Sequence, residues 1–184
     1  MSYSIVYADP PWNFTDGFWD RSVSDPSNHY ATMSTNDICL LNVPAITNKN
    51  CHLYMWTTSR HLMNGDAVRV VESWGFRPMN IITWCKTSIS LGYYFRNSTE
   101  HLIFGIKGKL HTLDRKQPTH IIAPRERHSK KPDIFRDMII RCSGDLPRIE
   151  LFARSCADGW DVFGNEIEGG VVLPLSNNRV QRTR

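Results

Sequence analysis

Apolar residues in this chain occur in short runs that polar and turn-forming residues separate. The runs are about four to eight residues long, rich in β-branched and aromatic side chains, and bounded by Pro, Gly, Asn or Asp, which is the pattern of buried strands. We expect strands at residues 3–8, 52–56, 80–86, 100–107, 119–123, 148–153 and 160–163.

Helical patterns lie between these runs. Ser34 is a favoured N-cap before the apolar run 38–41, and a Thr-Thr-Ser sequence precedes a segment at 60–74 whose apolar residues recur on one helical face. Gly75 is expected to end that helix. Pro132 stands at the first position of a further helix that runs to about residue 142.

Strands that alternate with helices predict an α/β fold with a mainly parallel sheet and helices on both faces. A chain of 184 residues is expected to form a single domain, 1–184, with residues 170–184 as a flexible basic tail. In such a sheet ligands bind at the carboxyl ends of the strands, so the residues that follow each strand are the first candidates for a site.

Composition narrows the classes of function. No apolar run is long enough to span a membrane, and the N-terminal residues lead into a strand pattern with no signal sequence. The five cysteines are scattered and odd in number, so we expect no disulfide framework, no zinc site and an intracellular, reducing setting.

Positive charge is concentrated within 107–131. Eight Lys or Arg residues fall there against two acidic ones, although the net charge of the whole chain is only +4. Such a patch, which includes Arg125 and Arg127, is typical of a polyanion partner, and a solvated loop explains it equally well. Residues 88–99 carry Arg96 beside aromatic residues, a mixture that suits either stacking on bases or a subunit contact.

The clearest candidate chemistry follows the first expected strand, as Asp9-Pro10-Pro11-Trp12. A carboxylate at a strand end is well placed for a site, and the prolines leave carbonyls that can accept from a ligand. Trp12 adds a flat aromatic surface. Together these groups suit an amine on a flat ring, such as N6 of adenine, whereas a turn with an Asp cap is the structural alternative.

A second candidate region follows the expected strands at 148–153 and 160–163. Glu166 has the position of an acidic residue that accepts ribose hydroxyls, but the unit has no GxGxxG loop for a pyrophosphate. A nucleoside-like cofactor without phosphates, such as S-adenosylmethionine, fits this pattern. A plain βαβ unit with surface charges fits it equally well.

Several ordered motifs in the chain carry a resemblance. They are DPPW (9–12), HYATMS (29–34), LYMWTTSR (53–60), IITWCKT (81–87), STEHLIFGIKG (98–108), SKKPD (129–133), IELFAR (149–154) and GWDVFGNE (159–166). The chain resembles the N6-adenine methyltransferase family that includes the catalytic subunit of the eukaryotic messenger-RNA adenosine methyltransferase. This likeness implies a Rossmann-like methyltransferase fold in which the catalytic motif precedes the cofactor strand.

The resemblance also implies roles for residues. Asp9 and Pro10 would hold the amine, with Pro11 and Trp12 in the same catalytic motif, and Tyr30 and Trp84 would flank the target base. The implied contacts to S-adenosylmethionine are Asp9, Lys131, Glu150, Phe152, Arg154, Asn165 and Glu166. Nucleic acid would be contacted by Arg96, Arg125 and Arg127, and no metal is expected.

The function expected from these features is S-adenosylmethionine-dependent methylation of adenine N6 in nucleic acid, DNA rather than RNA, in a microbial or viral setting. Three alternatives stay open: an inactive nucleic-acid-binding partner subunit, a methyltransferase for another amine such as cytosine N4, and a non-enzymatic nucleic-acid binder. The partners expected are nucleic acid and either a second copy of the chain or a related subunit.

Overall fold

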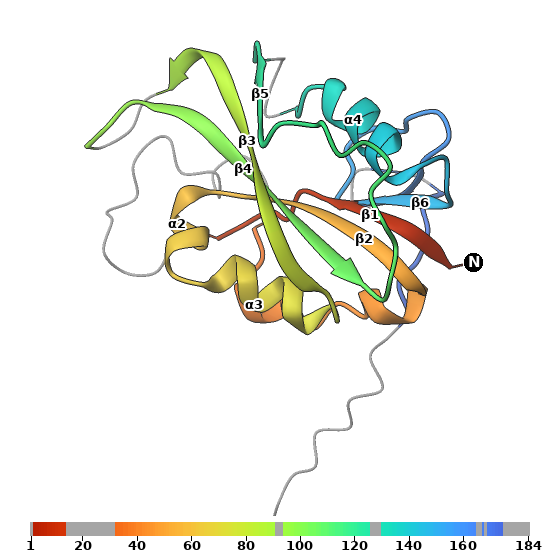
Figure 1. The fold of residues 1–184 in the computed structure, drawn as a ribbon. Coiled ribbons are helices and arrows are strands. Elements are labelled where there is room, and N and C mark those ends of the chain that lie inside the picture. The colour runs from red at the N-terminus through yellow and green to blue at the C-terminus, as the bar shows by residue number, and fades with distance from the viewer. Residues whose placement is uncertain are drawn as a thin grey trace, which may run out of the picture.

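The computed structural model describes residues 2–13, 32–90, 94–125, 130–164, 167 and 169–174, and Figure 1 shows how its elements are arranged. The helices are α1 (Thr35–Cys39), the short 3₁₀ helix η2 (Val43–Ile46), α2 (Ser59–Met63), α3 (Asp66–Ser73) and α4 (Ile134–Ser143). The strands are β1 (Tyr3–Ala8), β2 (Thr47–Thr57), β3 (Arg77–Ser90), β4 (Asn97–Lys107), β5 (His120–Ala123), β6 (Arg148–Leu151) and β7 (Asp161–Phe163).

The strands of the described residues form one sheet in the order β5-β3-β4-β2-β1-β6-β7. β1 pairs in parallel with β2 and β6, β6 with β7, and β3 with β5. β4 runs antiparallel to both of its neighbours, β2 and β3. The expected α/β architecture with a mainly parallel sheet is confirmed, and β4 makes the sheet mixed.

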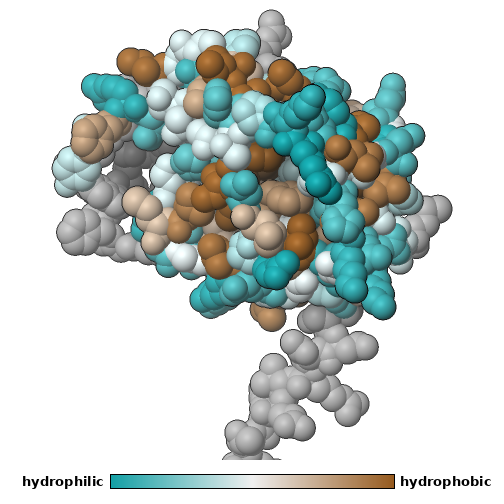
Figure 2. All heavy atoms as spheres, in the orientation of Figure 1, coloured by the Kyte–Doolittle hydropathy of each residue, from teal (hydrophilic) through white to brown (hydrophobic). Residues whose placement is uncertain are grey.

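Helices cover both faces of the sheet, as expected (Figure 1). One core lies under α1 and α3, where Val6, Leu53 and Ile103 meet Val70 and Val71. The other lies under α4, and its members include Tyr7, Trp56, Trp84, Phe135 and Met138. The alternation of side chains along each strand sends neighbouring residues into different cores. Figure 2 shows apolar atoms at the surface in the middle of one face, where β3 and β4 lie in front in Figure 1.

The helix expected at 60–74 is instead two helices, α2 and α3. Gly65 separates them with a φ of 84°, a left-handed conformation that glycine adopts without steric cost. The predicted cap holds at the start of α2, because Thr58 accepts a hydrogen bond from the backbone N–H of His61. At the start of α1, Ser34 caps in the same way.

Candidate active site

A cavity of about 420 Å³ opens at the carboxyl edge of the sheet, where β1, β2, β5 and β6 end and β4 begins. This is where the direction of the parallel strands predicts a ligand. Its described lining consists of Asp9, Pro10, Pro11, Trp12, Thr32, Trp56, Thr57, Thr58, Ser59, Arg60, Lys86, Asn97, Thr99, Glu100, Arg125, Lys131 and Arg154. Five of these side chains are cationic and two are carboxylates.

The Asp-Pro-Pro-Trp turn is anchored to the sheet and to the chain that follows it. The backbone N–H of Asp9 donates to the carbonyl of Leu151 in β6 at 3.3 Å, which extends the pairing of β1 with β6. The Pro10 carbonyl accepts from the N–H of Trp12 at 2.9 Å, and the Pro11 carbonyl from the N–H of Met33 at 2.8 Å. Each of these carbonyls therefore holds one bond already, and its second lone pair can accept another.

A chain of ion pairs crosses the floor of the cavity. Lys131 Nζ lies 2.7 Å from Oδ2 of Asp9 and 3.4 Å from Oε2 of Glu100. Glu100 also accepts from Lys86 Nζ at 2.6 Å. Three elements distant in sequence, the end of β1, the start of β4 and the segment before α4, are joined in this way.

Electrostatic coupling shifts the pKa values of the central pair. Burial works against charge in both groups, lowering the pKa of Lys131 and raising that of Glu100. The carboxylates of Asp9 and Glu100 outweigh burial at Lys131, so its pKa lies above its ordinary value. The two lysines likewise bring the pKa of Glu100 below its ordinary value. Both groups are therefore charged at neutral pH.

Trp12 is held from two sides. Its indole Nε1 donates to the carbonyl of Trp56 at 3.0 Å, and the ring of His61 stacks on it with a centroid separation of 4.8 Å. Only 5% of Trp12 is exposed. The flat surface that the sequence offered for stacking on a ligand is thus largely covered by the protein itself, although Trp12 still contributes to the cavity wall.

Comparison with known proteins identifies the family, because the MT-A70 family model matches residues 3–166. The chain belongs to the MT-A70 family. Its architecture is accordingly the expected methyltransferase fold, and the cavity that holds the Asp-Pro-Pro-Trp turn lies within the matched residues.

Curated relatives of this MT-A70 chain include bacterial and eukaryotic proteins. A type II methyltransferase, M.MunI from Mycoplasma sp, is 33% identical over 90% of this chain and 78% of its own length. A putative N(6)-adenosine-methyltransferase of Medicago truncatula is 31% identical, over 91% of this chain and 27% of its own length. The human N(6)-adenosine-methyltransferase catalytic subunit METTL3 is 28% identical, with 91% and 28% covered.

The structure brings most of the expected catalytic and cofactor residues of the MT-A70 chain together. Asp9, Pro10, Pro11, Trp12, Lys131 and Arg154 all line the cavity, and so does Arg125, an expected nucleic-acid contact. Arg96 lies outside that lining, exposed between β3 and β4. Tyr30, Arg127, Asn165 and Glu166 lie outside the described residues.

Trp84 is not among the described residues that line the cavity, and its expected contact with the target base stays a prediction. It is 3% exposed, its Nε1 donates to the carbonyl of Ala123 at 2.9 Å, and its ring packs edge-on against Trp56. Its place in β3 turns the side chain toward the core under α4. Burial of its large aromatic ring in that core stabilises the fold.

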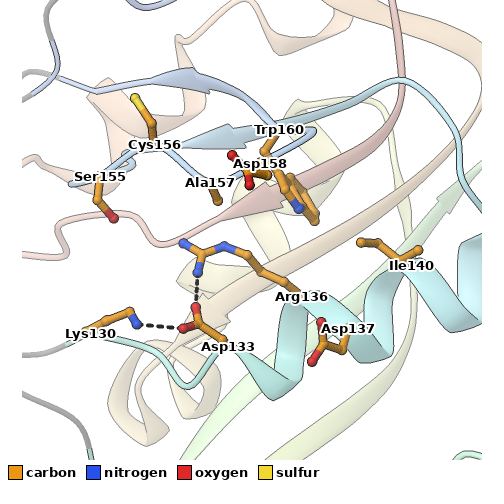
Figure 3. Close-up of a pocket in the computed structure, with 10 residues that line it drawn as sticks. All are labelled: Lys130, Asp133, Arg136, Asp137, Ile140, Ser155, Cys156, Ala157, Asp158 and Trp160. Atoms are coloured by element: carbon orange, nitrogen blue, oxygen red, sulfur yellow. Dashed lines mark hydrogen bonds and ion pairs between the residues drawn. The ribbon is translucent and has the colours of Figure 1, made fainter.

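Glu150 is also outside the described lining, and its expected contact with S-adenosylmethionine stays a prediction. Its side chain points toward α4, where Arg136 binds it with two hydrogen bonds of 2.8 and 3.0 Å. Figure 3 shows Arg136 in a second cleft, with Asp133 and Lys130 on the α4 side and Trp160 and the loop 155–158 opposite. The two bonds from Arg136 give each of the two Glu150 oxygens a hydrogen-bond partner. Glu150 is not among the described residues that line the candidate cavity. Phe152 is likewise absent from that lining, and its ring packs edge-on against Phe163.

Glu100, Lys86 and Arg60 are lining residues that the sequence reasoning missed. Residues that follow a strand lie at the carboxyl edge of the sheet only where that strand runs in the parallel direction. Because β4 is antiparallel, its first residues face the carboxyl edge instead. Glu100 belongs to the motif at 98–108. The antiparallel direction of β4 is the information that would have identified it as a site residue.

Two further observations concern the described residues. No group of three or more His, Cys, Asp and Glu side chains among them could hold a metal ion. Every helix in the same part of the chain is too short or too polar to cross a membrane.

Proposed function

We propose that this MT-A70 chain transfers a methyl group from S-adenosylmethionine to N6 of adenine in DNA. The observation that carries the proposal is the position of the Asp-Pro-Pro-Trp turn, which lies at the carboxyl edge of the sheet in one cavity with Lys131, Glu100 and Arg154. Membership of the family and the N(6)-adenosine methyltransferases among its relatives support the same chemistry.

The side chains of the cavity suit S-adenosylmethionine. The methionyl part of that molecule presents a carboxylate, and the cavity offers cations for it in Lys131 and Arg154. Its volume of about 420 Å³ lies within the range of small-molecule sites. When bound, S-adenosylmethionine supplies a methyl group that the sulfonium makes electrophilic.

The protein's own task concerns the adenine amine. The N6 lone pair is delocalised into the purine ring, and the amine has two hydrogens to donate. The Asp9 carboxylate and the second lone pair of the Pro10 carbonyl can accept them, which draws the nitrogen toward tetrahedral geometry. Positive charge develops on that nitrogen during transfer, and Asp9 stabilises it. The proton can leave afterwards, so Asp9 need not act as a strong base.

Lys131 supports this role by holding Asp9. The bond of 2.7 Å from Lys131 to Oδ2 fixes the orientation of the Asp9 carboxylate. Its other oxygen can therefore accept from the substrate amine without a further loss of side-chain freedom. Glu100 fixes Lys131 in turn. The ion-pair chain thereby orients the group that receives the substrate.

The surplus of cations around the cavity supports a nucleic-acid substrate. Arg60, Arg125 and Arg154 add positive charge to the lining, and phosphate contacts of this kind dominate nucleic-acid affinity. A paired adenine would have to leave the base stack to reach Asp9. We propose DNA rather than RNA because M.MunI, a type II methyltransferase, matches over 90% of this chain and 78% of its own length.

The test is incubation with isotope-labelled S-adenosylmethionine and matched DNA and RNA, each single- and double-stranded, followed by nucleoside mass spectrometry. The expected product is N6-methyladenine from DNA. Labelled N4-methylcytosine, or no labelled nucleoside at all, would contradict the proposed chemistry. A labelled adenosine from RNA alone would contradict the choice of DNA.

A further inference from the structure

His61 is a buried polar residue at the edge of the candidate site. Only 1% of it is exposed, although it belongs to the first turn of α2, next to residues that line the cavity. Its imidazole stacks on the indole of Trp12 with an interplanar angle of 26°. Buried polar side chains are costly unless they are hydrogen-bonded, so the partners of this ring are informative.

Both ring nitrogens of His61 have partners. Nε2 lies 3.1 Å from the backbone carbonyl of Asn13, the residue that follows the Asp-Pro-Pro-Trp turn, and Nδ1 lies 2.8 Å from Oγ1 of Thr58. A carbonyl can only accept, so Nε2 carries the proton. In a neutral imidazole that carries its proton on Nε2, Nδ1 can only accept, so the Thr58 hydroxyl donates to it. This tautomer satisfies both described bonds of the ring.

These contacts join the helix that follows β2 to the turn that follows β1. His61 binds the carbonyl immediately after Trp12 and covers the Trp12 ring, while Trp56 at the end of β2 accepts the Trp12 indole N–H. The end of the turn is thus fixed by side-chain contacts from β2 and α2. Its start is fixed by the pairing of β1 with β6 and by the bond between Lys131 and Asp9.

We infer that His61 is a positioning residue, which holds Trp12 and the Asn13 carbonyl so that Asp9 and Pro10 keep the geometry needed for methyl transfer. This inference rests on the proposed function. His61 has no reacting atom to contact in this role, because it acts through the turn. A displacement of about 1 Å at such a site can lower turnover by about 100-fold.

Three substitutions separate the contributions of the ring and of its hydrogen bonds. His61→Ala removes both, His61→Phe keeps an aromatic ring without the bonds, and His61→Gln keeps an amide N–H that can donate to Asn13. We expect kcat to fall about 10- to 100-fold in His61→Ala, with the Kd of S-adenosylmethionine within about twofold of the unmodified protein. His61→Gln should recover more of kcat than His61→Phe, because the bond to Asn13 sets the path of the chain. Met63→Gln, an 83% exposed residue of the same helix, is the control and should leave kcat unchanged.

A readout independent of activity uses the Trp12 indole N–H. The chain has six tryptophans, so ¹⁵N-labelled protein gives few indole cross-peaks, and Trp12→Phe identifies the relevant one. Solvent exchange of that proton should accelerate about tenfold or more in His61→Ala, because the turn opens locally. An unchanged exchange rate together with an unchanged kcat in His61→Ala would overturn the inference. A loss of kcat that parallels a loss of cofactor affinity in all three variants would also overturn it. If the unmodified protein methylates no adenine, the proposed function fails, and the exchange rates alone decide whether His61 holds the turn.

Discussion

Lys131 Nζ lies 2.7 Å from Oδ2 of Asp9, although 122 positions separate the two residues in the chain. Asp9 follows β1, and Lys131 directly precedes the residues that open α4. The contact therefore links the Asp-Pro-Pro-Trp turn to the second half of the chain. Because Glu100 binds the same ammonium group, a single cation serves two carboxylates, one directly after β1 and one in β4.

Asp9→Asn is expected to abolish most methyl transfer while leaving the fold intact. Asparagine keeps the shape of the side chain but loses the negative charge that stabilises the developing charge on the amine. Loss of such a group lowers turnover by about 100-fold or more. Single-turnover assays with labelled cofactor would measure the effect, and circular dichroism would verify the fold. Activity within a few fold of the unmodified protein would show that Asp9 is not the acceptor.

Lys131→Met should destabilise the protein by about 2 kcal/mol at neutral pH, because two carboxylates would face each other without a shared cation. Urea unfolding monitored by tryptophan fluorescence would measure the change. Lys130→Met is the matched control: its ion pair with Asp133 is solvent-exposed, and such pairs contribute about 1 kcal/mol or less. Equal losses of unfolding free energy in the two variants would mean that Lys131 stabilises the protein no more than an exposed ion pair does.

Glu100→Gln should reveal the acid sensitivity of this chain of ion pairs. Burial raises the pKa of Glu100, but Lys131 and Lys86 bring the pKa below its ordinary value of 4.5. A carboxylate whose pKa is lowered by folding stabilises the native state above its unfolded pKa, and loses that contribution as pH falls through the folded pKa. The difference in unfolding free energy between the unmodified protein and Glu100→Gln should therefore be constant above about pH 4.5 and shrink below it. A difference that grows with acidification would contradict the assigned direction of the shift.

The sequence predicted best those elements whose boundaries depend on local chemistry. The strand at Tyr3–Ala8 was expected at the same residues, because an apolar run meets Asp9 and two prolines that cannot continue it. The helix that follows Pro132 was expected within about two residues, since a proline at its start and an apolar face both indicate it.

Relations between elements were harder to predict. Periodicity predicted a strand around Trp84, but it cannot say which face of the strand a helix will cover, and α4 covers the face that carries this ring. In the same way, nothing local shows that β4 runs antiparallel, and that direction is what places Glu100 at the cavity. Strand direction and the packing of helices across the sheet are therefore the features that sequence reasoning could not supply.

Gly164→Ala should disturb the sheet beside the candidate cofactor region. A Cβ atom at this position would lie 2.2 Å from the backbone carbonyl oxygen of Ala153, so the ends of β6 and β7 would have to separate. Such overpacking costs about 1–3 kcal/mol. Calorimetry should also show weaker binding of S-adenosylmethionine, because Asn165 and Glu166, both expected cofactor contacts, follow directly. Gly105→Ala, whose nearest contacts would be 3.3 Å from side-chain atoms, is expected to have a smaller effect on stability and none on cofactor binding.

Arg125→Gln is expected to reduce the salt dependence of nucleic-acid binding. Arg125 is exposed just after β5 and lines the cavity, so its guanidinium is well placed for a phosphate of a strand whose adenine enters the site. Removal of one phosphate contact lowers the slope of log K against log salt concentration by about one, and weakens binding to all sequences alike. Arg77→Gln is the matched control, because Arg77 is equally exposed but begins β3 at the opposite edge of the sheet. Fluorescence anisotropy with a labelled DNA duplex at several salt concentrations would compare the two variants. An unchanged slope in Arg125→Gln, or an equal reduction in Arg77→Gln, would show that the phosphate backbone does not pass this side of the cavity.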